Sequence, residues 1–354
     1  MNNVCIISFG DISRPKNGYH IRTLMLARKI KNEGNNVTVY QFNKKNDSFS
    51  VDGIQIISLQ TGHQKKTRIR IFFENIISFD PFSIVFFEFE GYYRLWQRRK
   101  EFVKYSQFYI EGALLINGFI FVKKYKRTII LDTHCINKDV ALKMLKINKI
   151  AGGIRTIIWH MIEKSLLKRS NYIITVSDED KKFIEKHYKI DTDIIKVIPN
   201  EVGGANLNKF KETAVGLRES LKLKTKYLSL FIGDLGAVHN KEAEKYIRNY
   251  LAPSCQNITF LMIGNNPNNF KNCKNIIYQG FVEDVDPYII MSDFCIAPLE
   301  IGSGTKTKVL DYLKYNKYIV ATPIALEGID TSNHDNIFIS SVGQFINIIN
   351  KKFE

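Results

Sequence analysis

The chain has 354 residues, a length that favours two domains at roughly 100–200 residues each. Its 45% apolar and 24% charged residues are typical of a globular protein and exclude a disordered chain or a fibre. Lys and Arg outnumber Asp and Glu by 51 to 35. Nearly all of this excess lies in residues 1–200, with 34 basic and 19 acidic side chains, whereas residues 201–354 carry 17 and 16. The basic half indicates an anionic partner or surface.

The cysteines are five, an odd number, and none forms a CxxC pair. This argues against a disulfide framework or a zinc site and favours a reducing, cytoplasmic compartment. We expect no signal peptide before Val4. The longest apolar stretch, residues 112–122, is shorter than the ~20 residues of a membrane-spanning helix.

In the first half, short β-branched runs alternate with longer helical periods. We expect strands at residues 4–9, 36–41, 84–89, 128–131 and 172–176. A helix at residues 19–31 should turn inward Ile21, Leu24, Met25 and Ala27. A helix at residues 154–169 should turn inward Ile154, Ile157, Ile158, Met161, Ile162 and Leu166. Ser177 should cap a further helix, with Asp180 three residues later. The βαβ opening implies a parallel sheet.

The strand that ends at Pro199-Asn200 is followed by a polar stretch with Gly203-Gly204, which predicts domains at 1–200 and 201–354. The alternation then resumes. We expect strands at residues 227–232, 259–263, 275–279, 294–297 and 318–321, and helices at 241–250, 287–291, 305–314 and 342–352. The predicted fold class is α/β, with two Rossmann-like doubly wound domains facing across a cleft. Ligands of such folds bind at the carboxyl ends of the strands.

The most informative segment is 297–313, which has the pattern of a strand, a glycine turn and a helix. Gly302 and Gly304 would let backbone approach a ligand closely. Ser303 or Thr305 would cap the helix, whose free N–H groups suit a diphosphate.

Lys306 and Lys308 add positive charge to the same turn, and Asp311 follows on the helical face of Lys308. A carboxylate there can accept hydrogen bonds from a ribose diol. The alternative is a tight turn followed by a capped helix with solvated lysines.

Two features of the first half have weaker local signals. The loop after the first strand opens a helix with Gly18 at the turn and Arg22 one turn later, which favours phosphate or sugar contact. It lacks the GxGxxG pattern of a nicotinamide site, and Arg22 can equally be a surface charge. His134 follows a strand end, where reactive side chains gather, although a lone histidine is more often a packed or solvated residue.

Metal binding is not expected. Asp191–Asp193 and Asp284–Asp286 have the short DxD spacing that can hold a divalent cation, but this pattern is common by chance. The first lies in a polar turn and the second resembles a helix cap, so we interpret both as structural.

Two segments, 92–100 and 119–127, mix aromatic and basic residues. This composition suits a membrane interface with anionic lipids or single-stranded nucleic acid, and it also suits a solvated helix face.

Several segments together resemble the retaining glycosyltransferases of family 4, which have the GT-B architecture. The resemblance spans residues 4–330 and is carried by segments 17–40, 165–177, 194–202, 230–247 and, most strongly, 280–329. It implies a nucleotide-diphosphate sugar as donor, no metal site, no cofactor, and retention of the anomeric configuration.

The resemblance also implies roles for matching residues. Gly18 would lie near the donor diphosphate, His134 would contact the donor sugar, and Lys308 with the turn 302–305 would hold the phosphates. Asp311 matches the second carboxylate of the family's E-x7-E pattern, whose first glutamate falls at Ser303. The expected catalytic residues are His134 and Lys308, and the expected donor-binding residues are Gly18, Arg22, Gly302, Ser303, Gly304, Thr305, Lys306 and Asp311.

The leading hypothesis is therefore sugar transfer to a glycan or a polyprenyl-linked acceptor, with the acceptor on the first domain. The basic half would contact the anionic cytoplasmic face of a membrane. The alternatives are a non-catalytic binding protein with the same fold or a nucleic-acid binder, for which no RNP, KH or zinc-knuckle motif is found.

Overall fold

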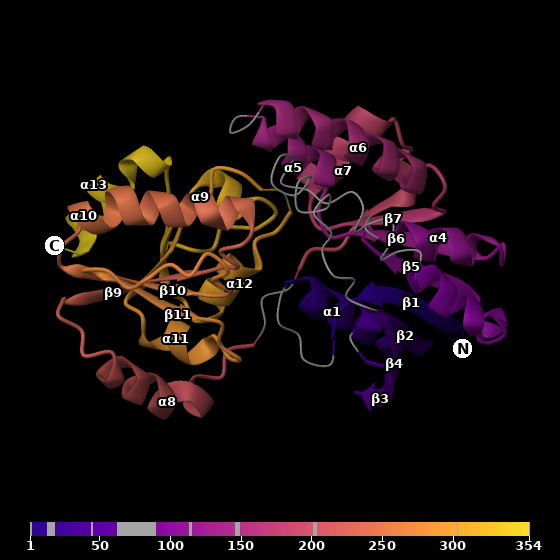
Figure 1. Ribbon diagram of the computed structural model, residues 1–354, viewed down its shortest axis with the longest axis horizontal. Helices are drawn as coiled ribbons and strands as arrows, with labels where there is room; N and C mark the ends of the chain where they lie inside the picture. Colours follow the sequence, from indigo (N-terminus) through magenta and orange to yellow (C-terminus); the bar gives the residue numbers. More distant parts are fainter. Residues whose placement is uncertain are drawn as a thin grey trace. The chain divides into compact units, whose positions relative to one another are not determined.

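Two β-sheets organise the chain, one in each of the units Met1–Pro199 and Asn200–Glu354 (Figure 1). The computed structural model describes residues 2–12, 18–43, 45–61, 90–112, 115–145, 149–200, 204–302 and 304–353. The predicted domain boundary, after residue 200, lies one residue from this division. The strand expected at 84–89 falls outside the described residues.

The first unit has eight strands in the order β3-β4-β2-β1-β5-β6-β7-β8. All neighbours pair in parallel except β3 with β4. Residues 90–97 are also helical. The named elements are β1 (Asn3–Phe9), α1 (Gly18–Asn32), β2 (Asn36–Asn43), β3 (Asp47–Val51), β4 (Ile54–Gln60), η1 (Glu101–Lys104), β5 (Gln107–Glu111), α4 (Ile116–Lys123), β6 (Thr128–Thr133), α5 (Asn137–Met144), α6 (Lys149–Leu167), β7 (Tyr172–Thr175), α7 (Asp178–Tyr188), η2 (Thr192–Ile194) and β8 (Ile195–Val197).

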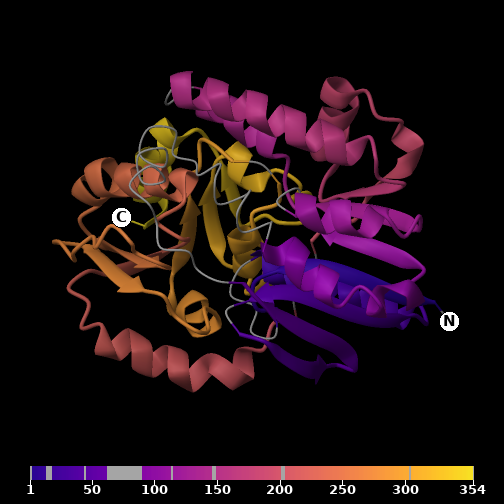
Figure 2. The same cartoon turned by 45° about the vertical axis from the view of Figure 1, so that its right-hand side comes forward.

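Both faces of this sheet are covered by helices. Alternate residues of its central strands point to opposite sides and so pack in two different cores. Val4 and Ile6 of β1 face the core that contains Leu24 of α1. Cys5 and Ile7 face a second core, to which α4 and α6 contribute. The two-sided burial explains why β1 is an almost continuous apolar run. Figure 2 shows these helices around the sheet.

The orientation of α6 agrees with the predicted one only in part: Leu166 is buried and Ile162 packs against the core, as expected. Ile154, Ile157 and Met161 are exposed, whereas Trp159 and Glu163 are buried. The Glu163 carboxylate accepts hydrogen bonds from the backbone N–H groups at 137 and 138 and from the Tyr188 hydroxyl. These bonds turn a charged residue inward, which an apolar spacing rule does not anticipate.

The first helix shows the same kind of exception. Ile21 is 46% exposed, while Arg22 and Thr23, both polar, are buried. The predicted cap of α7 is confirmed, because the Ser177 hydroxyl accepts from the Asp180 N–H at 3.1 Å.

The second unit has six parallel strands in the order β11-β10-β9-β12-β13-β14. Its elements are α8 (Leu207–Ser220), β9 (Tyr227–Ile232), α9 (Val238–Tyr246), a π-helical turn η3 (Ile247–Leu251), α10 (Ala252–Ser254), β10 (Ile258–Ile263), β11 (Ile276–Gly280), α11 (Asp286–Met291), β12 (Phe294–Ala297), α12 (Thr307–Lys314), β13 (Tyr318–Ala321), η4 (Pro323–Leu326), β14 (Ile337–Ile339), η5 (Val342–Gln344) and α13 (Phe345–Phe353). The predicted α/β class with parallel sheets is confirmed.

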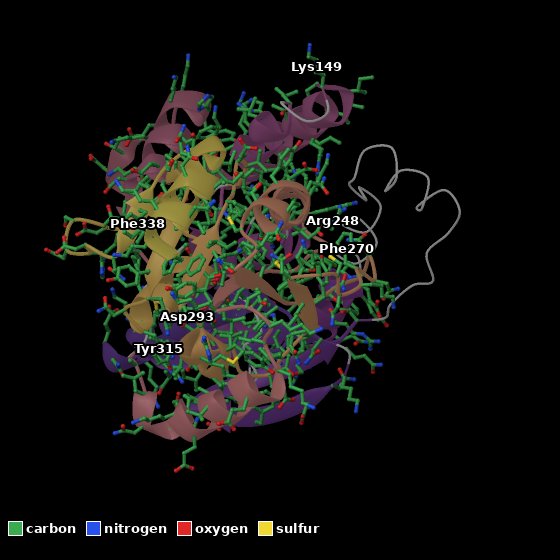
Figure 3. All side chains as sticks on the ribbon, turned by 90° about the vertical axis from the view of Figure 1, so that its left-hand side faces the viewer. Lys149, Arg248, Phe270, Asp293, Tyr315 and Phe338 are labelled. Carbon is green, nitrogen blue, oxygen red and sulfur yellow. The ribbon has the colours of Figure 1, made fainter. Side chains whose placement is uncertain are left out.

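Helix α8 lies in the polar stretch that was expected to mark the domain boundary. Asn206 caps it by accepting from the Lys209 N–H. Arg218 forms an ion pair with Asp293 at 2.8 Å, and Asp293 also accepts from the Leu228 N–H (Figure 3). These bonds fasten a mostly polar helix to the start of β9 and β12.

A glycine contact joins the loops that follow β9 and β10. Gly264 has a φ of +138°, and a Cβ built on it would lie 2.0 Å from the Gly233 carbonyl oxygen. The backbone therefore passes so closely that no side chain fits at residue 264.

We expect Gly264→Ala to lower the free energy of unfolding by about 3 kcal/mol or more, because the strained φ adds to the clash. Gly216→Ala is the matched control, since Gly216 lies in α8 and a Cβ added there would meet no described atom within 4 Å. It should raise stability by about 0.5–1 kcal/mol. Urea unfolding measures both, and equal stabilities for the two variants would contradict the role of Gly264.

Candidate functional site

The strand order reverses direction at one point in each sheet. In the first unit β1 pairs with β2 on one side and β5 on the other, and in the second unit β9 lies between β10 and β12. At such a point the chain leaves neighbouring strands toward opposite faces, which is where ligands of doubly wound folds bind. Two polar clusters lie at these two positions.

The first cluster centres on His134 and Glu111. Glu111 ends β5 and is fully buried, and its Oε2 lies 2.8 Å from His134 Nε2. The Tyr19 ring stacks on the His134 ring with centroids 4.1 Å apart, and the Tyr19 hydroxyl donates to the Glu111 backbone carbonyl. With Nε2 directed at Glu111, Nδ1 is the His134 nitrogen left for a substrate. Gly18 begins α1 directly before Tyr19.

Arg22 is buried next to this cluster and binds Asp132, which lies near His134 in the chain. It is 1% exposed, and its guanidinium donates to both oxygens of Asp132, at 2.8 and 2.7 Å, and to the Ile198 carbonyl. Asp132 lies in β6, two residues before His134. This geometry favours a structural role for Arg22, and its expected contact with the donor stays a prediction.

Glu111 is the residue of this cluster that the sequence did not indicate. Burial and the neighbouring Asp132 raise its pKa, and the hydrogen bond with His134 opposes the shift. Its second oxygen, Oε1, is buried and has no hydrogen-bond partner among the described residues. The only local signal was a carboxylate at the end of an apolar run.

Glu111, Asp132 and His134 also have ligand atoms within 4.8 Å of one another, the spacing of a metal-binding set. Both Asp132 oxygens, however, already accept from Arg22. A guanidinium at this position repels a divalent cation, so the residues fit a hydrogen-bonded cluster better than a metal centre. Both DxD segments are local turns, because Asp191 accepts from Asp193 N–H and Asp284 from Asp286 N–H.

The second cluster is built on the turn between β12 and α12. Gly302 and Gly304 have φ values of +136° and +70°, which only glycine adopts readily. Lys306 is 8% exposed, and its ammonium donates to the Gly304 carbonyl at 2.5 Å. Ser303 lies outside the described residues.

The predicted cap of α12 is wrong for Thr305. The N-cap residue is Lys306, whose side chain makes no capping bond. The Thr305 hydroxyl oxygen is buried, and none of the residues that the structure describes forms a hydrogen bond with it. The β12–α12 turn thus holds a buried hydroxyl without a described partner, and the first N–H groups of α12 are not capped by the Lys306 side chain.

Lys308 is 9% exposed and lies two residues after Lys306, in the first turn of α12. Its ammonium donates to Asn240 Oδ1 at 2.6 Å and lies 4.1 Å from the centroid of the Phe231 ring. Burial and the nearby Lys306 lower the pKa of Lys308 to about 7. Phe231 belongs to β9 and Asn240 to α9, so the loop after β9 completes this cluster.

His239 is a further member that the sequence did not indicate. It lies in the first turn of α9, and burial together with Lys308 and Lys306 lowers its pKa to about 4. The segment GDLGAVHN, which ends with His239-Asn240, has no charge pattern to mark it.

Asp311 is not brought together with these cations. Burial and the neighbouring Asp286 raise its pKa to about 7, while Lys314 opposes the shift. Lys314 in turn pairs with Asp286 at 2.7 Å. The expected contact of Asp311 with a ribose stays a prediction.

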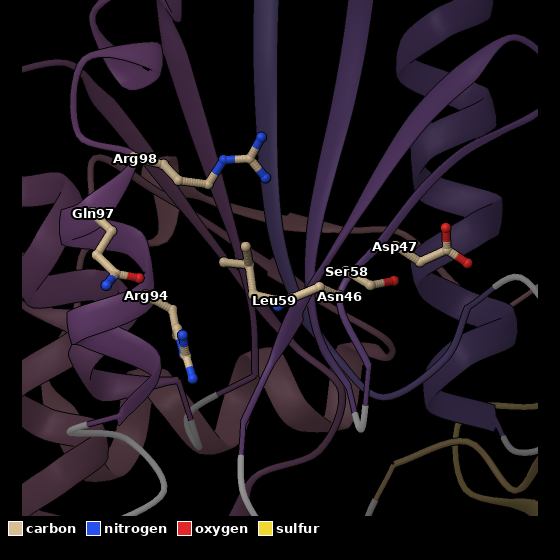
Figure 4. Close-up of a pocket in the computed structure, with 7 residues that line it drawn as sticks. All are labelled: Asn46, Asp47, Ser58, Leu59, Arg94, Gln97 and Arg98. Atoms are coloured by element: carbon tan, nitrogen blue, oxygen red, sulfur yellow. The ribbon is translucent and has the colours of Figure 1, made fainter.

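A cavity of about 430 Å³ lies elsewhere in the first unit, where β3 and β4 meet the helix at 90–97. Figure 4 shows Arg94 and Arg98 on one side of it and Asp47 on the other. None of the expected site residues lines it. The lining residues are Asn46, Asp47, Ser58, Leu59, Arg94, Gln97 and Arg98.

The two clusters differ in what they can bind. The second presents two buried ammonium groups, a neutral imidazole and a hydroxyl at the start of a helix, which together suit an anion such as a diphosphate. The first presents an imidazole and carboxylate, which suit sugar hydroxyls.

Part of the second unit matches a known protein family. Residues 226–351, which run from β9 into α13, match the family model described as glycosyl transferases group 1. No curated protein sequence matches the chain.

Solved structures, several of them of glycosyltransferases, resemble the whole chain. Anabaena Alr3699/HepE, in complex with UDP and glucose, is 13% identical with a TM-score of 0.67, covering 98% of this chain and 89% of that one. A glycosyltransferase from Rickettsia africae is 17% identical with a TM-score of 0.62, covering 100% and 89%. WaaG, a glycosyltransferase involved in lipopolysaccharide biosynthesis, is 12% identical with a TM-score of 0.64, covering 98% and 90%.

At these identities the likeness shows the fold alone. The chain therefore has the GT-B fold, and its residues 226–351 match the glycosyl transferases group 1.

Proposed function

We propose that this chain is a retaining, metal-independent glycosyltransferase of the hexosyltransferase type. It would move a sugar from a nucleotide-diphosphate sugar to a glycan or a lipid-linked acceptor in surface polysaccharide or glycoconjugate synthesis. The observation that carries the proposal is the pair of buried lysines, Lys306 and Lys308, within the segment that matches the group 1 family model. The UDP and glucose bound by HepE support a nucleotide sugar as donor.

In this proposal the cluster around Lys308 holds the donor diphosphate. As the sugar leaves, negative charge develops on the diphosphate, and fixed cations and N–H donors at that point lower the barrier. Domain closure would exclude water and so limit hydrolysis. No cofactor is needed, since lysines and backbone amides supply the charge. His134 and Gly18, in the first unit, would face the donor sugar and diphosphate.

The first unit would bind the acceptor, which we propose to be a glycan or a polyprenyl-linked glycan. The basic excess of residues 1–200 supports an acceptor at the anionic cytoplasmic face of a membrane. The protein would be cytoplasmic and peripheral to that face.

A second candidate is a non-catalytic binding protein with the same fold. The replacement of the family's first glutamate by Ser303, together with the position of Asp311 beside Asp286, supports it. Binding of a nucleotide sugar without transfer or hydrolysis would distinguish this candidate from the enzyme.

The donor can be identified by a thermal-shift screen with UDP, GDP, ADP and dTDP sugars, because a ligand of the folded state alone raises Tm. We expect the sugars of one nucleotide to raise the Tm of the parent protein.

We expect Lys308→Ala to lower the rate of sugar transfer from that donor by about 100-fold or more. Lys314→Ala, in the same helix but paired with Asp286, is the control and should retain the rate within about threefold. Full activity of Lys308→Ala would refute the phosphate site.

Donor binding should weaken as pH rises. A pKa of about 7 leaves Lys308 charged below pH 7 and increasingly neutral above it in the empty site. The diphosphate favours the charged form, so Kd should increase by up to about tenfold per pH unit above pH 7. Calorimetry between pH 6 and 8.5 tests this with the donor from the screen. Lys308→Arg stays charged and should flatten the curve, whereas a flat curve for the parent would contradict the assignment.

His134→Ala should slow sugar transfer by roughly tenfold, the effect of one lost substrate hydrogen bond of about 1.4 kcal/mol. His160→Ala is the control, because His160 lies on α6 and contacts Lys138. The measurement is the initial rate at saturating donor. An unchanged rate in His134→Ala would remove His134 from the site.

A further inference from the structure

Helix α6 carries a row of exposed apolar side chains. Ile150, Ile154, Ile157 and Met161 are 74, 38, 64 and 67% exposed. Their spacing of four, three and four residues places them on one face of the helix. Single exposed apolar residues are ordinary, but a continuous row marks an interaction surface.

The opposite face of α6 is already occupied, so the row cannot be the core face of this helix. Trp159 and Leu166 are 5% and 1% exposed and belong to the core shared with α4. Glu163, the acidic residue of α6, is 3% exposed and binds Tyr188 and the start of α5. It therefore adds no negative charge to the exposed row.

Most charges on α6 and on two neighbouring segments are positive, whereas α7, on the same core, carries Asp178, Glu179, Asp180 and Glu185. We call residues 90–104, 116–127 and 149–169 the outer helical layer; these segments contribute to one core beneath a sheet face, a core that α5 and α7 also share. The layer contains fourteen Lys and Arg against three Asp and Glu. Of the three, Glu163 is buried and Glu101 pairs with Arg98 at 2.7 Å. Lys149, at the start of α6, points away from the helix (Figure 3).

The same layer exposes two aromatic rings. Tyr93 and Trp96 are 50% and 44% exposed, and their rings stack with centroids 6.4 Å apart. The Arg99 guanidinium lies 4.3 Å from the centroid of the Trp96 ring. Rings with a polar edge beside cations are typical of the headgroup level of a membrane.

Segment 119–127 was expected to expose both aromatic and basic side chains, but its phenylalanines are buried. Phe119, Phe121 and Val122 are buried in the core, so the segment exposes Ile120 and its cations but no phenylalanine. Its basic residues remain part of the layer.

We propose that the outer helical layer binds the surface of an anionic membrane, with the apolar row of α6 inserted among the acyl chains and the Tyr93–Trp96 pair at the headgroup level. The row supplies apolar area and the layer supplies the opposite charge to anionic lipid. A second copy of this chain is a poorer occupant, because two such layers would repel. Among the described residues no helix is both long and apolar enough to cross a membrane. In this proposal α6 would lie in the plane of the interface.

This inference rests on the proposed function, because a lipid-linked acceptor would lie at the membrane surface that the outer helical layer binds. Its test is independent of sugar transfer. The full chain is floated with vesicles of 70% phosphatidylcholine and 30% phosphatidylglycerol, and with vesicles of phosphatidylcholine alone. We expect binding to the anionic vesicles only, weakened by 0.5 M salt.

The variant Ile157→Glu/Met161→Glu should reduce partitioning at least about tenfold, since it places two charges in the apolar row. The control Leu207→Glu/Val215→Glu makes the same change at residues 54% and 53% exposed on α8 and should bind like the parent. Both pairs are exposed, so Tm should change little in either variant.

Equal flotation of the two variants would overturn the proposal, and so would absence of flotation by the parent. A parent dimer that Ile157→Glu/Met161→Glu dissociates, without flotation, would assign the row to a second copy instead. Nucleotide-sugar thermal shifts on the same samples keep the two proposals apart. Flotation without a donor shift would refute the proposed function alone, and a donor shift without flotation would refute the membrane surface alone.

Discussion

The parallel strand order, which reverses at β1 and at β9, is the constraint on which both clusters depend. Parallel strands end at one edge of the sheet, so residues far apart in the chain meet there without a long loop. Glu111 and His134 come from two neighbouring strand ends, and Lys308 and Asn240 from two helices that begin at the same edge. The strand pairing of each sheet therefore determines which residues can meet in each cluster.

The two clusters handle buried charge differently. In the first, Arg22 and Asp132 neutralise each other with bidentate geometry, which is the arrangement that makes a buried ion pair tolerable. In the second, Lys308 has an amide oxygen and an aromatic face as its nearest described partners, so its charge is solvated only in part. Such incomplete compensation is typical of a site that awaits an anionic ligand.

Sequence reasoning located the strands that build the clusters but not all of the side chains in them. The bounds of β12 and β13 were predicted to the residue, because buried parallel strands are short apolar runs between turn residues. The face of α6 was predicted only in part: Leu166 is buried as expected, but Ile157 and Met161 are exposed, because apolar periodicity gives no weight to a buried carboxylate such as Glu163. His239 and Glu111 were missed, since their roles arise from tertiary neighbours and no local pattern marks them.

Lys308, at the start of α12, affects the free energy of unfolding of the unliganded protein and its affinity for an anionic ligand in opposite directions as the pH changes. The pKa of Lys308 is lowered to about 7 from an ordinary value of 10.5, so between these values the unfolded chain holds the proton more tightly than the folded one. At pH values above this window the penalty for burying the charged ammonium is gone, whereas below it the folded protein bears that penalty in full. Loss of the proton also removes the charge that a diphosphate needs. The pH at which the unliganded protein is most stable is therefore also the pH at which Lys308 binds an anionic ligand least well.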